Sequence, residues 1–177
     1  MKALKERNVT LTSDPYWPDR YETESERVKD ASDSRLLDVF HVGSTAIPDV
    51  PGKPALDIIA VYENEDAMET AIEQLTDDDR YEQEGDSTVL IRWADEYAVF
   101  VKMHTRNDEK VRSQLLFRDY LRENSDARAE YTRVKQEAAE NHPEDLEAYT
   151  KAKSETVQSI LEQAQEEGYA KRLPDFV

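Results

Sequence analysis

The chain has 177 residues, a length typical of one domain that buries about two thirds of the surface its unfolded form exposes. It has no cysteine and three histidines, which excludes disulfides, cysteine-based zinc sites and thiol nucleophiles. The net charge of −17 argues against general nucleic-acid binding, because phosphate backbones would be repelled. With no signal peptide and no long apolar run, we expect a single domain over residues 1–177, in a cytoplasmic protein without a membrane partner.

Acidic residues are scattered along the whole chain, and residues 77–79 form the only uninterrupted acidic run of three. Such a surface repels itself at low salt but is tolerated in molar salt, where the Debye length falls to about 3 Å. We hypothesise a halophilic cytoplasm; the alternative is an ordinarily acidic bacterial protein. Equal thermal stability in dilute buffer and in concentrated KCl would exclude the halophile hypothesis.

The first 105 residues carry the strand patterns. Residues 55–62 form a near-continuous apolar run, which predicts a strand covered on both faces. Alternation over residues 97–105 places Val99 and Val101 on one face and Lys102 and His104 on the other. Six segments are predicted as strands, the fourth more weakly than the rest: residues 9–12, 36–43, 55–62, 81–84, 87–93 and 97–105.

Helical spacing and cap residues predict two helices among these strands and three after them. In the first helix, Glu24 and Arg27 are expected to face solvent, and Gly168 is expected to end the last one. The predicted helices cover residues 17–31, 66–75, 108–123, 126–140 and 143–167. The fold class is therefore α+β, with a sheet-rich part over about residues 8–105 and a C-terminal layer of three helices over about 108–168.

The stretch HVGSTAIPDVPGKPALD, residues 41–57, contains residue types that indicate a functional site as well as a turn between two strands. Gly43 permits backbone angles that a side chain forbids, and the hydroxyls of Ser44 and Thr45 can donate to an anion. Asp57 follows in an apolar run, where a carboxylate is costly to bury without a partner such as a metal ion. Phosphate-gripping amides and hydroxyls beside a strand carboxylate are what nucleotidyl transfer needs, although a plain turn between strands is the alternative.

The chain resembles the GrpB family over roughly residues 10–165. The resemblance is carried by Tyr16-Trp17-Pro18, by HVGSTAIP and KPALDI, by FRDYLR at residues 117–122, and by YTKAKS at residues 149–154. It implies a nucleotidyltransferase-like fold with a mixed sheet, and kinship with the domain fused behind some dephospho-CoA kinases. The family's own reaction is not firmly assigned, so the resemblance implies a fold more than a function.

The chain departs from the pattern of active nucleotidyltransferases at the metal site. The superfamily's Asp-x-Asp reads Asp57-Ile58-Ile59 here, so the second metal ligand is missing. A further acid on a later strand is replaced by Lys102-Met103-His104, of which His104 matches the GrpB pattern. Asp49 also stands where the pattern usually has glycine. Whether the chain is an enzyme is left open; if it is one, the resemblance implies a metal-dependent nucleotidyltransferase with an incomplete set of metal ligands.

Several residues are predicted to surround the turn, and three of them have an alternative role. Asp57 is the candidate Mg²⁺ ligand and catalytic carboxylate, and His104 is either a catalytic base or a hydrogen-bonded structural residue. Lys53, Lys102 and Arg118 are candidate phosphate cations; the alternatives are a solvated loop lysine at position 53 and an internal salt bridge between Arg118 and Asp119.

The positions of Lys135 and Lys153 are left open: these side chains either line the same pocket or lie in water. The side chain of His41 is expected to face this pocket.

Three functions are compatible with these residues. The first is a nucleotidyltransferase-like protein that binds a nucleotide or another phosphorylated small molecule at residues 43–45. The second is a catalytically inactive module that binds a nucleotide or a coenzyme-A-type ligand, which Ile59 favours. The third is a structural domain that binds a partner protein through its helical layer. The sequence sets no oligomeric state.

Overall fold

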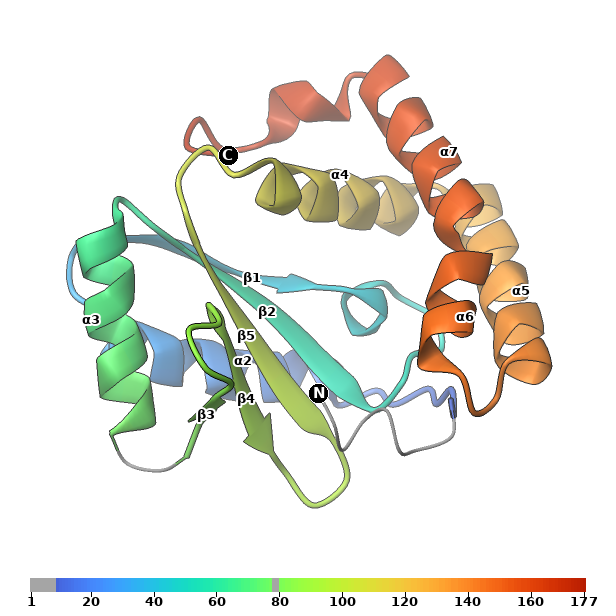
Figure 1. Ribbon diagram of the computed structural model, residues 1–177. Helices are drawn as coiled ribbons and strands as arrows, with labels where there is room; N and C mark the ends of the chain where they lie inside the picture. The colour runs from blue at the N-terminus through green and yellow to red at the C-terminus, as the bar shows by residue number, and fades with distance from the viewer. Residues whose placement is uncertain (1–8, 78–79) are drawn as a thin grey trace.

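A five-stranded mixed sheet lies at the centre of the computed structural model, which describes residues 9–77 and 80–177 (Figure 1). The strand order is β1-β2-β5-β4-β3; β2 and β5 are parallel, and the other neighbours are antiparallel. The strands are β1 (Leu36–Val42), β2 (Ala55–Tyr62), β3 (Glu82–Gln83), β4 (Val89–Trp93) and β5 (Ala98–Thr105). The predicted α+β class and mixed sheet are confirmed.

Strand β2 is central because both of its faces are apolar. Leu56 and Ile58 are fully buried in one hydrophobic cluster, whereas Ile59 and Val61 are buried in another on the opposite face. Asp57 is the polar exception and is only partly buried. The near-continuous apolar run therefore predicted a strand covered on both faces correctly.

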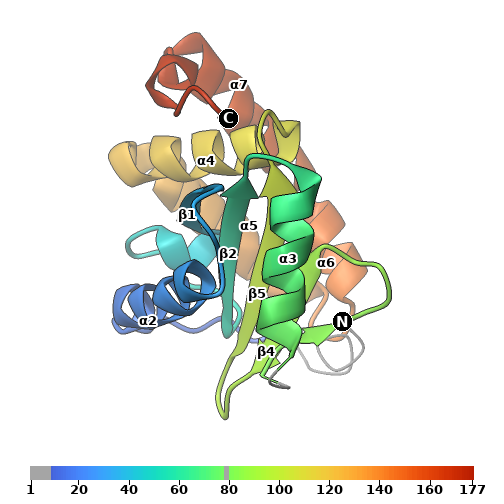
Figure 2. The same ribbon diagram turned by 90° about the vertical axis from the view of Figure 1, so that its left-hand side faces the viewer.

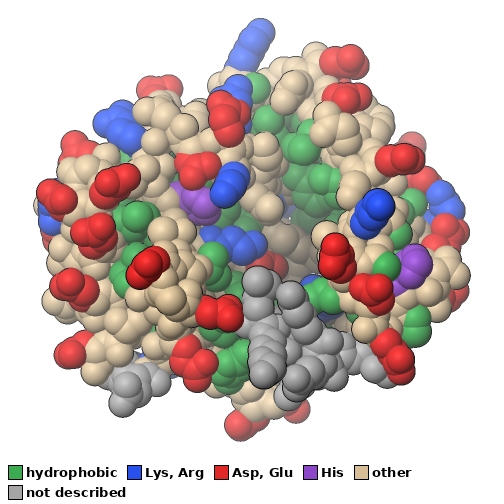
Figure 3. Space-filling model, viewed as in Figure 1, with side chains coloured by type: hydrophobic (Ala, Val, Ile, Leu, Met, Phe, Trp, Pro, Cys, Tyr) green, Lys and Arg blue, Asp and Glu red, His purple; other side chains and the backbone are tan. Residues whose placement is uncertain are grey.

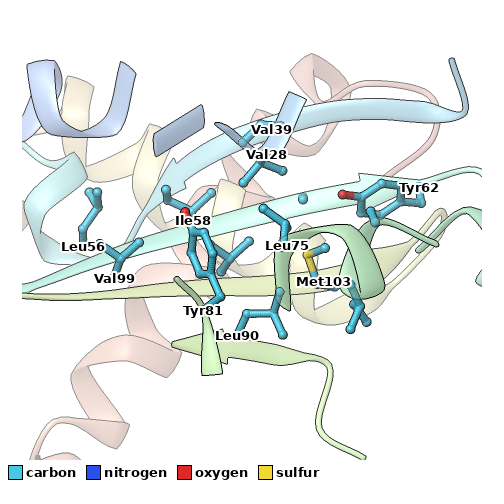
Figure 4. Packing of buried hydrophobic residues seen from close by; sticks show 14 of the residues in the cluster. Val28, Val39, Leu56, Ile58, Tyr62, Leu75, Tyr81, Leu90, Val99 and Met103 are labelled. Carbon is cyan, nitrogen blue, oxygen red and sulfur yellow. The ribbon is translucent and has the colours of Figure 1, made fainter. Parts of the chain in front are cut away.

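One face of the sheet is covered by α2 (Trp17–Asp30) and α3 (Glu65–Thr76). Their apolar residues pack against β2, β4 and β5, and Figure 4 shows Val28 of α2, Leu75 of α3 and Met103 of β5 within this cluster. The Asn64 side chain caps α3 by accepting a hydrogen bond from the Ala67 amide. This larger cluster holds the sheet in place beneath the candidate site.

Glu24 does not face solvent as expected: it is 1% exposed. Its carboxylate accepts a 2.6 Å hydrogen bond from the Tyr81 hydroxyl and pairs with Arg92 and Arg27. Burying a carboxylate requires such partners. Two of them, Tyr81 and Arg92, lie far along the chain, so the pattern of α2 alone could not predict this burial.

The opposite face is covered by a C-terminal helical layer. Figure 1 and Figure 2 place α4 between the sheet and α7. The prediction of one continuous helix over residues 143–167 is wrong, because this segment forms two helices, α6 and α7, with Lys153 between them. The layer consists of α4 (Glu109–Glu123), α5 (Ser125–Asn141), α6 (Leu146–Ala152) and α7 (Ser154–Glu166), followed by the short helix η2 (Tyr169–Arg172).

The segment before α2 is not the edge strand predicted over residues 9–12. Thr12 forms only an isolated antiparallel bridge with Gly52, and the Val9 amide donates to the Pro143 carbonyl at 2.6 Å. Instead of pairing along a sheet edge, Val9 packs in a small hydrophobic cluster with Ala138 and Tyr149. No helix in the part of the chain that the structure describes is long and apolar enough to cross a membrane.

Candidate functional site

The turn between β1 and β2 is shaped by Gly43. Its φ of 73° and ψ of −171° lie in a region that is essentially restricted to glycine. The β1–β2 register pairs Val42 with Asp57, and a Cβ on Gly43 would lie 2.7 Å from the Asp57 Oδ2. The next residues form the short helix η1 (Ser44–Ala46). Glycine is therefore required both by the backbone and by the carboxylate beside it.

A cavity of about 400 Å³ lies between this turn, the sheet and the C-terminal helices. We call it the lysine cavity, because four lysines and a single carboxylate, that of Asp57, are among its lining residues. Those lysines are Lys53, Lys102, Lys135 and Lys153. Figure 3 shows a hollow near the middle of the face seen in Figure 1, with basic side chains beside it and acidic side chains scattered around it.

Asp57 is paired with Lys102. The Lys102 Nζ lies 2.8 Å from the Asp57 Oδ1, and both side chains are partly exposed. The parallel β2–β5 register brings them together, because it pairs Asp57 with Phe100 and Ile59 with Lys102. An ammonium group thus occupies the neighbourhood of the carboxylate where a metal ion was predicted.

Lys135 reaches the turn from α5. It is 1% exposed, donates a 2.6 Å hydrogen bond to the Ser44 Oγ, and also donates to the Pro51 carbonyl. Burial, followed by repulsion from Lys153 and Lys53, lowers the pKa of Lys135 to about 7. Its ammonium therefore links the helical layer to the Gly43–Ala46 turn.

Lys153 and Lys53 share one aromatic wall, the ring of Tyr149. The Lys153 Nζ lies 3.9 Å from the ring centroid and the Lys53 Nζ 5.8 Å from it. Burial and the charge of Lys53 lower the pKa of Lys153 to about 8, and burial also lowers the pKa of Lys53. Each lysine is thus held in a site that disfavours its own charge.

His41 lies on the far side of the turn. Its Nε2 is 2.9 Å from the Thr45 Oγ1, its ring stacks on Tyr21, and burial lowers its pKa to about 4. His41 lines a separate cavity of about 760 Å³ with Trp17 and Tyr21, and Thr45 is the one residue that lines both cavities. The expectation that His41 faces the same pocket as Asp57 is therefore wrong.

Two predicted site residues lie outside the residues that line the lysine cavity. The His104 Nδ1 is 2.7 Å from a carboxylate oxygen of Asp108, the residue that caps α4. The Arg118 Nε donates to Asp119 at 2.7 Å, and its NH1 donates to the His41 carbonyl at 3.2 Å. These contacts tie α4 to β5 and β1.

The remaining predicted residues come together, because Gly43, Ser44, Thr45, Lys53, Asp57 and Lys102 all line the lysine cavity. Sequence reasoning left Lys135 and Lys153 open and gave Tyr131 and Tyr149 no role at the site, although all four line the cavity. A signal was present in the helical spacing. Each lysine follows its tyrosine by four residues, a spacing that predicts that both side chains lie on one face of a helix.

The donor set does not match a resident metal site. Within residues 9–77 and 80–177 there is no group of three or more His, Cys, Asp or Glu side chains that could hold a metal ion. Asp57 offers one carboxylate, already paired with Lys102, and Ile59 is fully buried among apolar residues. A clamp of two metal ions needs more carboxylates than these residues supply.

The backbone conformation at Asp49 explains why the GrpB pattern usually has glycine at this position. Asp49 has a φ of 62°, in the left-handed region that glycine adopts without strain and that Asp tolerates better than most residues.

Comparisons with solved structures agree with the fold described above. The crystal structure of conserved protein GrpB from Enterococcus faecalis matches with a TM-score of 0.75 and 26% identity, over 91% of this chain and 99% of that one. A CdnE c-di-GMP synthase from Capnocytophaga granulosa matches with a TM-score of 0.53 over 93% of this chain and 70% of that one. Because the two sequences are only 10% identical, this match supports a shared nucleotidyltransferase-like fold and nothing further.

Sequence comparisons identify the family. A UPF0157 protein of Halalkalibacterium halodurans is 32% identical over 91% of this chain and 86% of its own length. A dephospho-CoA kinase of Mycolicibacterium paratuberculosis is 31% identical over 79% of this chain, which spans 42% of that kinase. The family model described as GrpB protein matches residues 9–163. The chain therefore belongs to the GrpB family.

Proposed function

We propose that the protein binds a phosphorylated small molecule, with a nucleotide as the first candidate, in the lysine cavity. The observation that carries the proposal is the convergence of four lysines and one carboxylate in a cavity of about 400 Å³. The chain as a whole has a net charge of −17, so this local excess of positive charge is opposite in sign to its average. Such a reversal favours an anionic ligand at this cavity.

The electrostatics of the lysines support an anion rather than an internal ion-pair network. Burial lowers the pKa of Lys135 to about 7 and of Lys153 to about 8, with repulsion from neighbouring lysines as the next cause. Asp57 opposes this shift in both cases but does not cancel it. A phosphate or diphosphate would supply the missing negative charge and favour the charged form of both lysines.

The turn supplies polar groups on the same cavity wall. The Ser44 hydroxyl accepts from Lys135 and also hydrogen-bonds to Tyr131, so the turn, a lysine and a tyrosine meet at one point of the cavity wall. Gly43 keeps this wall free of a side chain next to Asp57. The turn, Lys53 and Lys102 are thus proposed to contact the phosphate groups, together with Lys135 and Lys153.

Binding without catalysis is the form of the proposal that the donor set favours. The Asp57 carboxylate alone does not form a preorganised Mg²⁺ site, and His104 is engaged by Asp108 outside the cavity lining. Mg²⁺ is proposed only as an ion that enters with the ligand, since Mg²⁺ often bridges phosphate oxygens with one or two protein carboxylates. Arg118 is proposed to hold α4 against β1 rather than to bind phosphate.

Isothermal titration calorimetry with pyrophosphate, ATP and coenzyme A, each with and without Mg²⁺, tests the proposal. Lys153→Met should weaken binding by roughly 10- to 100-fold, because a hydrogen bond to a charged group contributes ~1.5–3 kcal/mol. Lys151→Met is the matched control: Lys151 is exposed on α6 and does not line the cavity. Its affinity should equal that of the wild type.

Three outcomes separate the hypotheses. Binding that does not need Mg²⁺ and is lost in Lys153→Met supports the proposal. Binding that requires Mg²⁺ and is lost in Asp57→Ala would favour the metal-dependent transferase instead. The absence of binding by all three probes would overturn the proposal and leave the partner-binding domain as the alternative.

A further inference from the structure

A second chamber of about 320 Å³ adjoins the lysine cavity over the outer part of the sheet. The two share four lining residues: Lys53, Ala55, Asp57 and Lys102. We call the second space the apolar chamber, because four of its six remaining lining residues are Val89, Ile91, Phe100 and Leu146; the other two are Glu84 and Ser87. One ligand can contact the lysines and this second chamber together, because Lys53, Asp57 and Lys102 line both spaces.

The register of the sheet explains why the surface changes character at this boundary. Phe100 on β5 pairs with Asp57 on one side and with Ile91 of β4 on the other, so the three side chains form a row across one face. In the next row, Lys102 pairs with Val89. Asp57 and Lys102 line both spaces, whereas Phe100, Ile91 and Val89 line only the second chamber.

We propose that the ligand of the lysine cavity is an organic di- or oligophosphate whose uncharged apolar or aromatic group lies in the apolar chamber, against Phe100, Ile91 and Leu146. This inference rests on the proposed function and adds the class of the organic part. The lysines bind the phosphate end, and the chamber selects for the group attached to it. Inorganic phosphate or pyrophosphate would use only half of the site.

The larger cavity of about 760 Å³ is a less suitable place for this group. It shares only Thr45 with the lysine cavity, and the hydrogen bond between Thr45 and His41 lies at the boundary. The apolar chamber instead shares the two lysines and the carboxylate that line the phosphate end. Its volume also falls within the range of cavities that hold small organic molecules.

Calorimetry with three probes of similar phosphate charge tests the inference: pyrophosphate, ADP and geranyl diphosphate. ADP places an aromatic base in the chamber and geranyl diphosphate a hydrocarbon, so the two distinguish the sources of the apolar group. At least one of them should bind about tenfold or more tightly than pyrophosphate, because each buried methylene contributes about fourfold in affinity.

Phe100→Ala should remove most of this advantage by taking away a wall of the chamber, while the affinity for pyrophosphate stays within about twofold of the wild type. Unchanged pyrophosphate binding also shows that the variant is folded. Phe176→Ala is the matched control, because Phe176 is a partly buried phenylalanine that lines neither chamber. It should keep the wild-type preference.

The failure of the inference is distinct from the failure of the proposed function. If pyrophosphate binds in a Lys153-dependent manner but neither organic probe binds more tightly, the inference is wrong and the phosphate site stands. The inference is equally wrong if Phe100→Ala and Phe176→Ala keep the preference to the same extent. If no probe binds, both proposals are overturned.

Discussion

Replacing Gly43 by alanine tests whether the turn and Asp57 are matched to each other. The backbone of Gly43 lies in a region that costs other residues about 1–3 kcal/mol. The new Cβ would also lie 2.7 Å from the Asp57 Oδ2, so the carboxylate must move, at a cost typical of overpacking of about 1–3 kcal/mol. The loss of the Asp57–Lys102 pair adds little, because both side chains are partly exposed. We expect a total destabilisation of about 2–6 kcal/mol.

Urea unfolding monitored by circular dichroism gives this value, and two further proteins separate its parts. Gly168 has a φ of 82°, and nothing lies within 4 Å of the position that a new Cβ would occupy, so Gly168→Ala reports a backbone cost of about 1–2 kcal/mol without a clash. In the Asp57→Ala background the carboxylate is absent, and Gly43→Ala should then cost about 1–3 kcal/mol less than in the wild type. If the two costs are equal, the contact between Gly43 and the carboxylate does not constrain the turn.

Two other predictions follow from buried charges. The affinity for pyrophosphate should fall as the pH rises above about 7, because Lys135 and Lys153 have pKa values lowered to about 7 and about 8 and lose their charges in this range. Calorimetry in buffers of different ionisation enthalpy should detect proton uptake on binding. An affinity that stays constant from pH 6.5 to 9 would contradict this prediction. Glu24→Ala should lower the free energy of unfolding by about 3 kcal/mol, because it leaves Arg92 and Arg27 without their buried partner, as urea unfolding would show. Glu130→Ala, which removes an exposed ion pair with Arg133, is its control and should change stability little; equal effects of the two substitutions would refute the argument.

The elements of the fold were largely predictable, because the patterns that specify them are local. The apolar run of β2 and the alternation of β5 each fix a strand within eight residues. The helix break at Lys153 was not predictable in this way, since the periodicity of apolar residues continues through it. Residues 9–12 alternate like a strand, but their hydrogen-bond partners lie in a loop and before α6 rather than along a sheet edge.

The candidate site was predictable only in part, because its residues come from distant elements. The turn and Asp57 are close in sequence, and their motif predicted that they share a site. The pairing of Asp57 with Lys102 depends on the parallel register of β2 and β5, which no local pattern specifies. The contact of Lys135 with Ser44 likewise depends on how α5 packs over the turn.

The origin of the four lysines has a consequence for the cohesion of the protein. Lys53 and Lys102 belong to the sheet and its loop, whereas Lys135 and Lys153 belong to the helical layer. Repulsion among these ammonium groups acts across the boundary between the two layers and opposes their packing. An anion shared by all four attracts both layers at once, so the same charges that weaken the boundary in the free protein would join it in the complex.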